Sequence, residues 1–123
     1  MNVTGLGTDL VAVPRVARLL ERHRDRFLVR CFRPGELEGG GGDEAAVVSG
    51  CWAAKEALLK ALGADVRHIP YRDVEVRRLP TGQPVLALHG IARATLDRRG
   101  GGRILVSISH ERDHALAVVL IAP

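Results

Sequence analysis

The chain has 123 residues, of which 46% are hydrophobic and 26% are charged. This composition is typical of one folded globular domain and argues against intrinsic disorder. A chain of this length has room for one sizeable core, so we predict a single domain over residues 1–123. Only 3% of the residues are aromatic, which leaves no obvious platform for stacking nucleic-acid bases.

The chain carries no sign of a membrane or secreted protein. No apolar stretch approaches the ~20 residues that span a bilayer, and residues 1–7 lack the order of a secretory signal. We therefore expect a cytoplasmic protein without a membrane partner. Cys31 and Cys51 are the only cysteines, and they form neither a CxxC pair nor a zinc-ligand pattern. We predict that both are reduced and buried.

Positive charge is concentrated in one stretch of the sequence. The formal net charge is +4, whereas residues 15–33 contain seven arginines against two acids, a local charge of +5. Such a stretch indicates an acidic partner: nucleic acid, a membrane surface or an acidic protein. A solvated helix face in an arginine-rich chain explains the pattern equally well.

The first half of the chain is predicted to hold one strand and two helices. Residues 3–11 form an apolar stretch that Gly5 and Gly7 interrupt and in which Asp9 is embedded, which suits a strand whose polar residue points into a site. Pro14 fits the first turn of a helix that continues through Phe27. Residues 33–37 resemble a loop that opens a short helical turn.

A long second helix should follow the glycine-rich loop at residues 39–42. Asp43 can cap its start, and Gly63 can end it after about Leu62. Helical spacing predicts that its buried side consists of Val47, Cys51, Ala54, Leu58 and Leu62.

The second half is predicted to consist of two hairpins around a helix. Residues 71–79 and 84–88 have strand patterns separated by a turn, residues 91–98 have a helical pattern, and residues 103–110 and 114–122 form a second strand pair. Hairpins rather than regular strand and helix alternation indicate an α+β fold, with a mostly antiparallel sheet packed against the long helix.

Only two of the basic residues are lysines, and both lie in the long helix. Lys55 and Lys60 stand there among sixteen arginines in the whole chain. A compact ammonium suits a site that holds a phosphate oxygen. The alternative is an ordinary surface ion pair between Glu56 and Lys60, which are four residues apart.

Two carboxylates from distant parts of the chain are candidate metal ligands. Asp9 lies in the first strand and Glu56 in the long helix. Magnesium typically takes one or two carboxylates and leaves its other positions to water and substrate phosphates. For a single Asp, a turn or capping role is the simpler interpretation, so neither residue alone establishes a metal site.

The late strand contains a serine and histidine pattern that does not suit nucleophilic catalysis. Ser107 and Ser109 share one face, and His110 lies on the other. The sequence shows no GxSxG elbow, Walker loop or GxGxxG loop. His110 is then either a ligand-binding residue or a hydrogen-bonded histidine at a strand end.

Taken together, these segments resemble the holo-acyl-carrier-protein synthases, the small type of 4′-phosphopantetheinyl transferase. The resemblance covers nearly the full chain, and its motifs occur in order. They are Gly7-Thr8-Asp9-Leu10, Phe32 to Glu36, Trp52 to Gly63, Asp73 to Val76, and Ser107-Ile108-Ser109-His110.

The resemblance implies transfer of the phosphopantetheine arm of coenzyme A to a serine of an apo carrier protein. Adenosine 3′,5′-bisphosphate would be released, and the nucleophile would belong to the carrier protein. Asp9 and Glu56 would hold Mg²⁺ against the pyrophosphate of coenzyme A and, with Lys60, form the catalytic group. Lys55, Lys60 and His110 would contact the phosphates of coenzyme A or lie beside them.

The family resemblance also implies a homotrimer with coenzyme A between subunits, and a first helix that docks the acidic carrier protein. The candidate carrier contacts are Arg15, Arg22, Arg26 and Phe27. Two positions depart from the family pattern: Cys51 replaces a frequent arginine and Asp65 a frequent glycine. These departures bear on coenzyme A affinity rather than on the metal pair.

Two other functions remain open at the level of sequence. A non-catalytic module could bind nucleic acid through the basic first helix, which explains the charge but not Asp9, Glu56 or the placement of the lysines. A member of the family that has lost its activity could bind carrier protein without modifying it. We expect the enzyme, with neither nucleic acid nor membrane as partner.

Overall fold

The computed structural model describes residues 2–38, 42–63 and 66–123. Its elements in chain order are β1 (Gly5–Ala12), α1 (Val13–Cys31), α2 (Glu44–Leu62), a 3-10 turn η1 (Tyr71–Asp73), β2 (Val74–Arg78), β3 (Pro84–Leu88), α3 (Gly90–Arg98), β4 (Arg103–His110) and β5 (His114–Ala122). The order agrees with the prediction from sequence, and the α+β class is confirmed.

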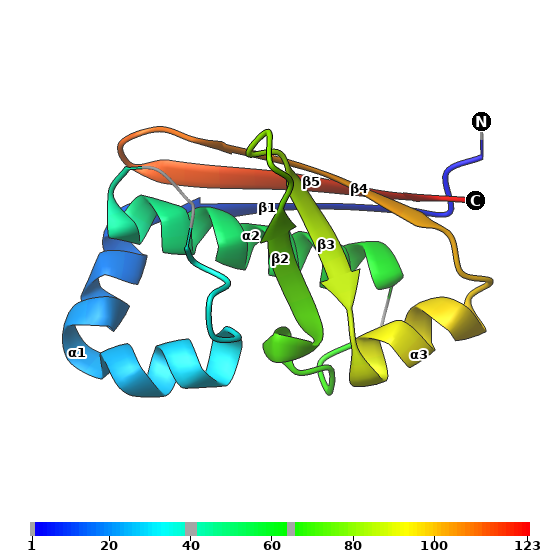
Figure 1. Ribbon diagram of the computed structural model, residues 1–123, viewed down its shortest axis with the longest axis horizontal. Coiled ribbons are helices and arrows are strands. Elements are labelled where there is room, and N and C mark those ends of the chain that lie inside the picture. The colour runs from blue at the N-terminus through cyan, green and yellow to red at the C-terminus, as the bar shows by residue number, and fades with distance from the viewer. Residues whose placement is uncertain (1, 39–41, 64–65) are drawn as a thin grey trace.

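The long helix α2 lies between two antiparallel sheets (Figure 1). On one side is a three-stranded sheet in the order β1-β5-β4, and on the other is the hairpin β2-β3. Both predicted hairpins are present, but they belong to different sheets, and the first strand completes the three-stranded one by pairing with β5. Helix α2 is therefore enclosed on two opposite sides.

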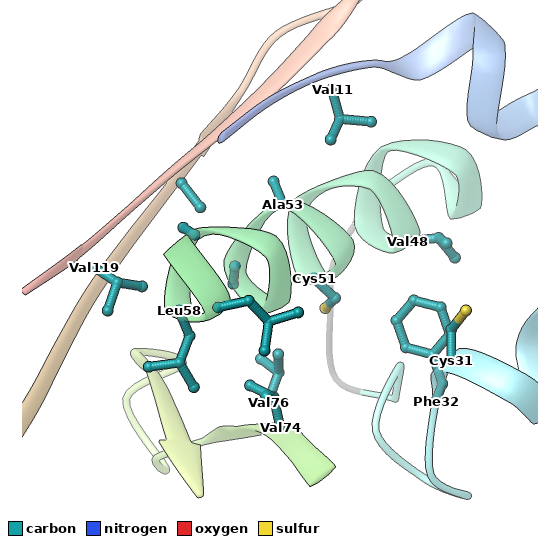
Figure 2. Close-up of a cluster of buried hydrophobic side chains, with 14 of the residues drawn as sticks. Val11, Cys31, Phe32, Val48, Cys51, Ala53, Leu58, Val74, Val76 and Val119 are labelled. Atoms are coloured by element: carbon teal, nitrogen blue, oxygen red, sulfur yellow. The ribbon is translucent and has the colours of Figure 1, made fainter. Parts of the chain in front are cut away.

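Enclosure by two sheets explains the composition of α2. Fourteen of its 19 residues are buried, most of them small or aliphatic. Figure 2 shows Ala53 facing β1 while Leu58 lies close to Val74 and Val76 of the hairpin. The predicted buried side was therefore too narrow, because two sheets cover the helix. Val47, its first predicted member, is only half-buried. Beyond its first turn, the less buried residues include Trp52, Glu56 and Lys60, spaced four apart along one open strip.

Strand β1 approaches α2 so closely that side chains are excluded between them. A Cβ added to Gly7 would lie 1.9 Å from the carbonyl oxygen of Ala57, and one added to Gly5 would lie 2.4 Å from that of Ala61. These glycines are required by the close approach of two backbones. Asp9 follows on the same face of β1, so this contact also sets the position of its side chain relative to α2.

The opposite face of the three-stranded sheet is rich in leucine and uncovered by other described parts of the chain. Leu6 pairs with Leu120, which pairs with Leu105, and Leu10 pairs with Leu116 in a second row. Leu6 and Leu10 are 61% and 64% exposed. This outer sheet face consists of these five leucines and Val118, with Thr8 and Ser107 on either side of Val118 and Ser109 beside Leu116. Its leucines form an exposed apolar surface on a small domain.

The largest differences from the predicted boundaries lie in three segments. Strand β1 begins at Gly5 rather than Val3, and α1 continues past Phe27 to Cys31 with a kink at His23. The segment from Tyr71 is a 3-10 turn before β2, closed by a hydrogen bond from Asp73 N to Pro70 O. Gly63 ends α2 as expected, with a positive φ of 101°.

Further predictions from the sequence can be compared with the structure. Cys31 and Cys51 are free and buried, as predicted. Asp43 precedes α2, but its side chain makes no capping hydrogen bond. The central part of the glycine-rich loop, residues 39–41, and Asp65 lie outside the described residues. Among the helices that are described, none is both long and apolar enough to cross a membrane.

Candidate active site

Asp9 and Lys60 meet although they are 51 residues apart. Lys60 Nζ lies 3.1 Å from Asp9 Oδ1 and donates a further hydrogen bond to Thr8 O at 3.1 Å. The Asp9 side chain is 16% exposed and that of Lys60 is 56% exposed. The pair thus lies at the surface end of the contact between β1 and the last turn of α2, accessible to a ligand.

Glu56 lies one helical turn before Lys60 and borders the same cleft. The cleft has a volume of about 230 Å³ and is lined by Asp9, Leu10, Val11, Arg15, Trp52, Glu56 and Lys60. Two carboxylates, an ammonium and a guanidinium therefore converge on it. Lys60 pairs with Asp9 and not with Glu56, so the ion pair suggested by helical spacing is not the one that forms.

The partner of Glu56 is Tyr71, which the sequence did not reveal. The Tyr71 hydroxyl donates a hydrogen bond to Glu56 Oε1. Burial raises the pKa of Tyr71, and its hydrogen bond to Glu56 raises it further, so the hydroxyl remains a proton donor. The Tyr71 ring packs edge-on against Trp52, and the Arg15 guanidinium lies 5.6 Å from the Trp52 ring centroid. An aromatic wall therefore supports one side of the cleft.

Lys55 faces the core, not the cleft. Its side chain is 0% exposed, and Nζ lies 2.6 Å from Glu36 Oε1, 3.1 Å from Tyr71 O and 2.5 Å from Val74 O. Burial lowers the pKa of Lys55, whereas the adjacent Glu36 carboxylate raises it. All three ammonium protons have acceptors inside the protein.

Both carboxylate oxygens of Glu36 also have hydrogen-bond partners inside the protein. It accepts backbone hydrogen bonds from Arg33 N at 2.8 Å and from Val76 N at 2.9 Å, besides its contact with Lys55. The pair therefore joins the turn after α1, the middle of α2 and strand β2. The sequence contained a signal for this role, because Lys55 follows the buried Cys51 by four residues and so continues the apolar stripe of α2.

His110 lies apart from the Asp9 cleft. It borders a small pocket of about 140 Å³ between the first half of α2, the β2-β3 hairpin and the end of β4, together with Arg78. Ser107 pairs with Val118 on the outer sheet face, opposite to the side of His110, as the alternation predicted. The described residues of one chain thus bring Asp9, Glu56 and Lys60 together but leave His110 in a second pocket.

Only some arginines of residues 15–33 are available to a partner. Arg24 donates two hydrogen bonds to Glu44, at 2.8 and 2.5 Å, which tie α1 to the start of α2 and lower the pKa of Glu44. Arg22 and Arg26 are exposed on α1. Phe27, expected as an apolar anchor for a partner, is instead buried.

The burial of Phe27 has a clear cause in its aromatic neighbours. Its ring lies edge-on to Phe32 at 5.8 Å and to Trp52 at 5.2 Å between centroids, so it fixes α1 against α2. The exposed surface of α1 is therefore provided by arginines rather than by this phenylalanine.

The donor set of the cleft fits a hard cation. Among the described residues there is no group of three or more His, Cys, Asp or Glu side chains that could hold a metal ion by themselves. Asp9 and Glu56 supply two carboxylates, and the cleft has no soft ligand. Mg²⁺ typically binds one or two protein carboxylates, and water and substrate phosphates provide its other ligands.

Comparisons with known proteins identify the family of this chain. The family model for the 4′-phosphopantetheinyl transferase superfamily matches residues 5–119. The chain is 42% identical over 119 residues to a holo-[acyl-carrier-protein] synthase from Gloeobacter violaceus, covering 94% of this chain and 90% of that protein.

Solved structures give the same result. The structure is similar to a holo-[acyl-carrier-protein] synthase from Neisseria meningitidis, with a TM-score of 0.86 and 30% identity over 99% of this chain and 100% of that one. It is also similar to the ACPS–CoA complex of Chronobacterium ammoniagenes, with a TM-score of 0.84 and 28% identity over 99% and 98% of the two chains.

The two lysines allow a matched test of the buried pair. Lys55→Met leaves the Glu36 carboxylate buried without its counterion, so we expect the free energy of unfolding to fall by about 3–5 kcal/mol. Lys60→Met removes a half-exposed ammonium and should cost less than about 1 kcal/mol. Urea unfolding of both variants measures the difference. Equal losses would show that the buried pair does not stabilise the fold.

Proposed function

Since this chain belongs to the 4′-phosphopantetheinyl transferase superfamily, we propose that it transfers the 4′-phosphopantetheine arm of coenzyme A to a serine of an apo acyl carrier protein. The other product is adenosine 3′,5′-bisphosphate. The observation that carries the proposal is the convergence of Asp9, Glu56 and Lys60 on one accessible cleft. The complex of a similar protein with coenzyme A supports the identity of the donor.

The reaction requires charge neutralisation more than covalent catalysis by the protein. The serine oxygen of the carrier protein forms a bond to the phosphorus next to pantetheine, and the bond from that phosphorus to the bridging pyrophosphate oxygen breaks. The serine proton passes to a carboxylate of the site or to water. The Lys60 ammonium stabilises the negative charge that develops on the leaving phosphate.

Asp9 and Glu56 are the proposed ligands of Mg²⁺. When bound, Mg²⁺ supplies Lewis-acid stabilisation of the pyrophosphate charge. Lys60 keeps Asp9 in place through its ion pair, and both backbone positions are fixed by the contact of β1 with α2. His110 stays a proposed phosphate contact, whereas Lys55 does not, because its ammonium is fully buried.

A homotrimer is part of the proposal. The outer sheet face presents two rows of leucines that no described segment covers, and such a surface in a small domain indicates contact with further copies of the chain. Leu10 lies on that face and borders a surface hollow with Ser109 and His110, next to Asp9 in the sequence. Association through this face would therefore lie directly beside the cleft.

Carrier protein is expected to dock on the exposed arginines of α1. Arg22 and Arg26 are exposed, and Arg15 lies at the rim of the cleft beside Trp52. Because an acidic helix would meet these groups in solvent, their main contribution should be to the rate of association.

The metal ligands are tested by isosteric amides. Asp9→Asn and Glu56→Gln each remove one anionic ligand, so we expect transfer to fall at least ~100-fold while the fold is kept. Intact-mass analysis of apo carrier protein, incubated with coenzyme A, Mg²⁺ and each folded variant, measures it. Wild-type turnover by either variant would contradict the assignment, and no mass gain with the unmodified protein would contradict the function.

The trimer is tested on the outer sheet face. Leu105→Glu places a charge opposite Leu120 in the first leucine row, where Leu105 is 47% exposed in a single chain. We expect this variant to be monomeric by light scattering, because a buried unpaired charge disfavours association. Ile91→Glu, on α3 and 42% exposed, is the control and should keep the trimeric mass. An active wild-type monomer would rule out the proposal.

The docking face is tested by charge reversal. Arg26→Glu should raise the apparent KM for carrier protein by about fivefold at low salt, and less at high salt, where the charges are screened. Arg98→Glu on α3 is the matched control and should leave this KM unchanged. Steady-state kinetics with varied carrier protein at two salt concentrations decide the matter, and equal KM values in both variants would exclude docking through α1.

A further inference from the structure

Tyr71 is held at two points by consecutive residues of α2. Its carbonyl oxygen accepts a hydrogen bond from the buried Lys55 ammonium at 3.1 Å, and its hydroxyl donates to Glu56 Oε1. Its ring is fixed by the edge-on contact with Trp52, with centroids 6.3 Å apart. The main chain, ring and hydroxyl of Tyr71 are thus all fixed relative to Glu56.

The hydrogen bond distinguishes the two oxygens of Glu56. Oε1 is occupied by Tyr71, whereas Oε2 accepts no hydrogen bond from any described residue. The Glu56 side chain borders the cleft with Asp9 on one side and a smaller pocket containing Tyr71 on the other. Glu56 and Lys60 line both pockets, and Tyr71 lines only the second.

We propose that the Tyr71 hydroxyl is a positioning group that restricts Glu56 to one-oxygen coordination of the metal. This inference rests on the proposed function, because it takes Glu56 as a ligand of Mg²⁺. The hydroxyl holds Oε1 away from the ion and leaves Oε2 as the ligating atom. Outer hydrogen bonds orient ligating carboxylates in metal sites generally.

Restriction to one oxygen favours Mg²⁺ over a larger cation. Mg²⁺ requires near-ideal octahedral geometry, in which a two-oxygen carboxylate fits poorly, whereas Ca²⁺ accepts six to eight oxygens and often binds both oxygens of one carboxylate. The Tyr71 hydroxyl therefore sets selectivity between the two ions as well as affinity for Mg²⁺. A residue that merely supported the fold would affect both ions alike.

Tyr71→Phe removes the hydroxyl and keeps the ring against Trp52. Since Trp52 is the only tryptophan of the chain and lines the cleft, its fluorescence reports metal binding in the presence of coenzyme A without turnover. We expect the dissociation constant for Mg²⁺ to rise about tenfold. The constant for Ca²⁺ should stay the same or fall. Unchanged Mg²⁺ affinity, or equal weakening for both ions, would overturn the proposal.

Ser49→Ala is the matched control for losing one hydroxyl hydrogen bond on α2. Ser49 Oγ donates to Ala45 O at 2.6 Å, away from Glu56. We expect its Mg²⁺ and Ca²⁺ constants to equal those of the wild type. Carrier-protein modification by the wild type is measured in parallel. Failure of the proposed function appears as no mass gain, whereas failure of this inference appears in the metal affinities of Tyr71→Phe while the mass gain is kept.

A measurement on the unmodified protein keeps the proposal testable even if Tyr71→Phe does not fold. Tyr71 is the only tyrosine, so labelling tyrosine with ¹³C at Cζ gives one NMR signal from the carbon that carries the hydroxyl. Adding Mg²⁺ with coenzyme A should shift this signal, because the Glu56 acceptor becomes less basic when it ligates a cation. No shift at saturating Mg²⁺ would overturn the proposal.

Discussion

The buried ion pair between Lys55 and Glu36 is the interaction on which the rest of the site depends. It joins three segments that are distant in sequence, and every polar atom involved has a partner within the protein. A buried pair with incomplete hydrogen bonding would cost more free energy than it returns. Here Lys55 also binds the carbonyl oxygen of Tyr71, so the same ammonium that joins the core fixes the residue that contacts Glu56.

Different sides of helix α2 have different functions. The sides that face the two sheets consist of small and aliphatic residues, and the open strip carries Trp52, Glu56 and Lys60 at four-residue spacing. Gly7 permits β1 to contact the backbone of this helix, which places Asp9 opposite Lys60. The cleft is therefore a consequence of core packing: both of its carboxylates are positioned by elements that have few alternative arrangements.

Much of the fold followed from local patterns, and the site followed in part. Glycine and proline positions and hydrophobic spacing predicted the number, type and order of the elements, because these signals are local. The division into two sheets depends on contacts between distant strands and was not predicted. The same limit applies to Lys55, which was grouped with Lys60 by residue type. Lys55 is fully buried and Lys60 is half-exposed because the two residues lie on different sides of α2. Which side is buried depends on the packing of both sheets against the helix.

The separation of His110 from the Asp9 cleft bears on the proposed association of several copies of the chain. Within one chain the two lie in different pockets, yet Leu10 borders both the cleft with Asp9 and the surface hollow with His110, on the edge of the uncovered outer sheet face. In the proposed trimer, copies of the chain would meet at this face, and coenzyme A would contact Asp9, Glu56 and Lys60 of one copy and His110 of a neighbour. The proposed trimer would then explain both the exposed leucines of this face and the separation of His110 from Asp9.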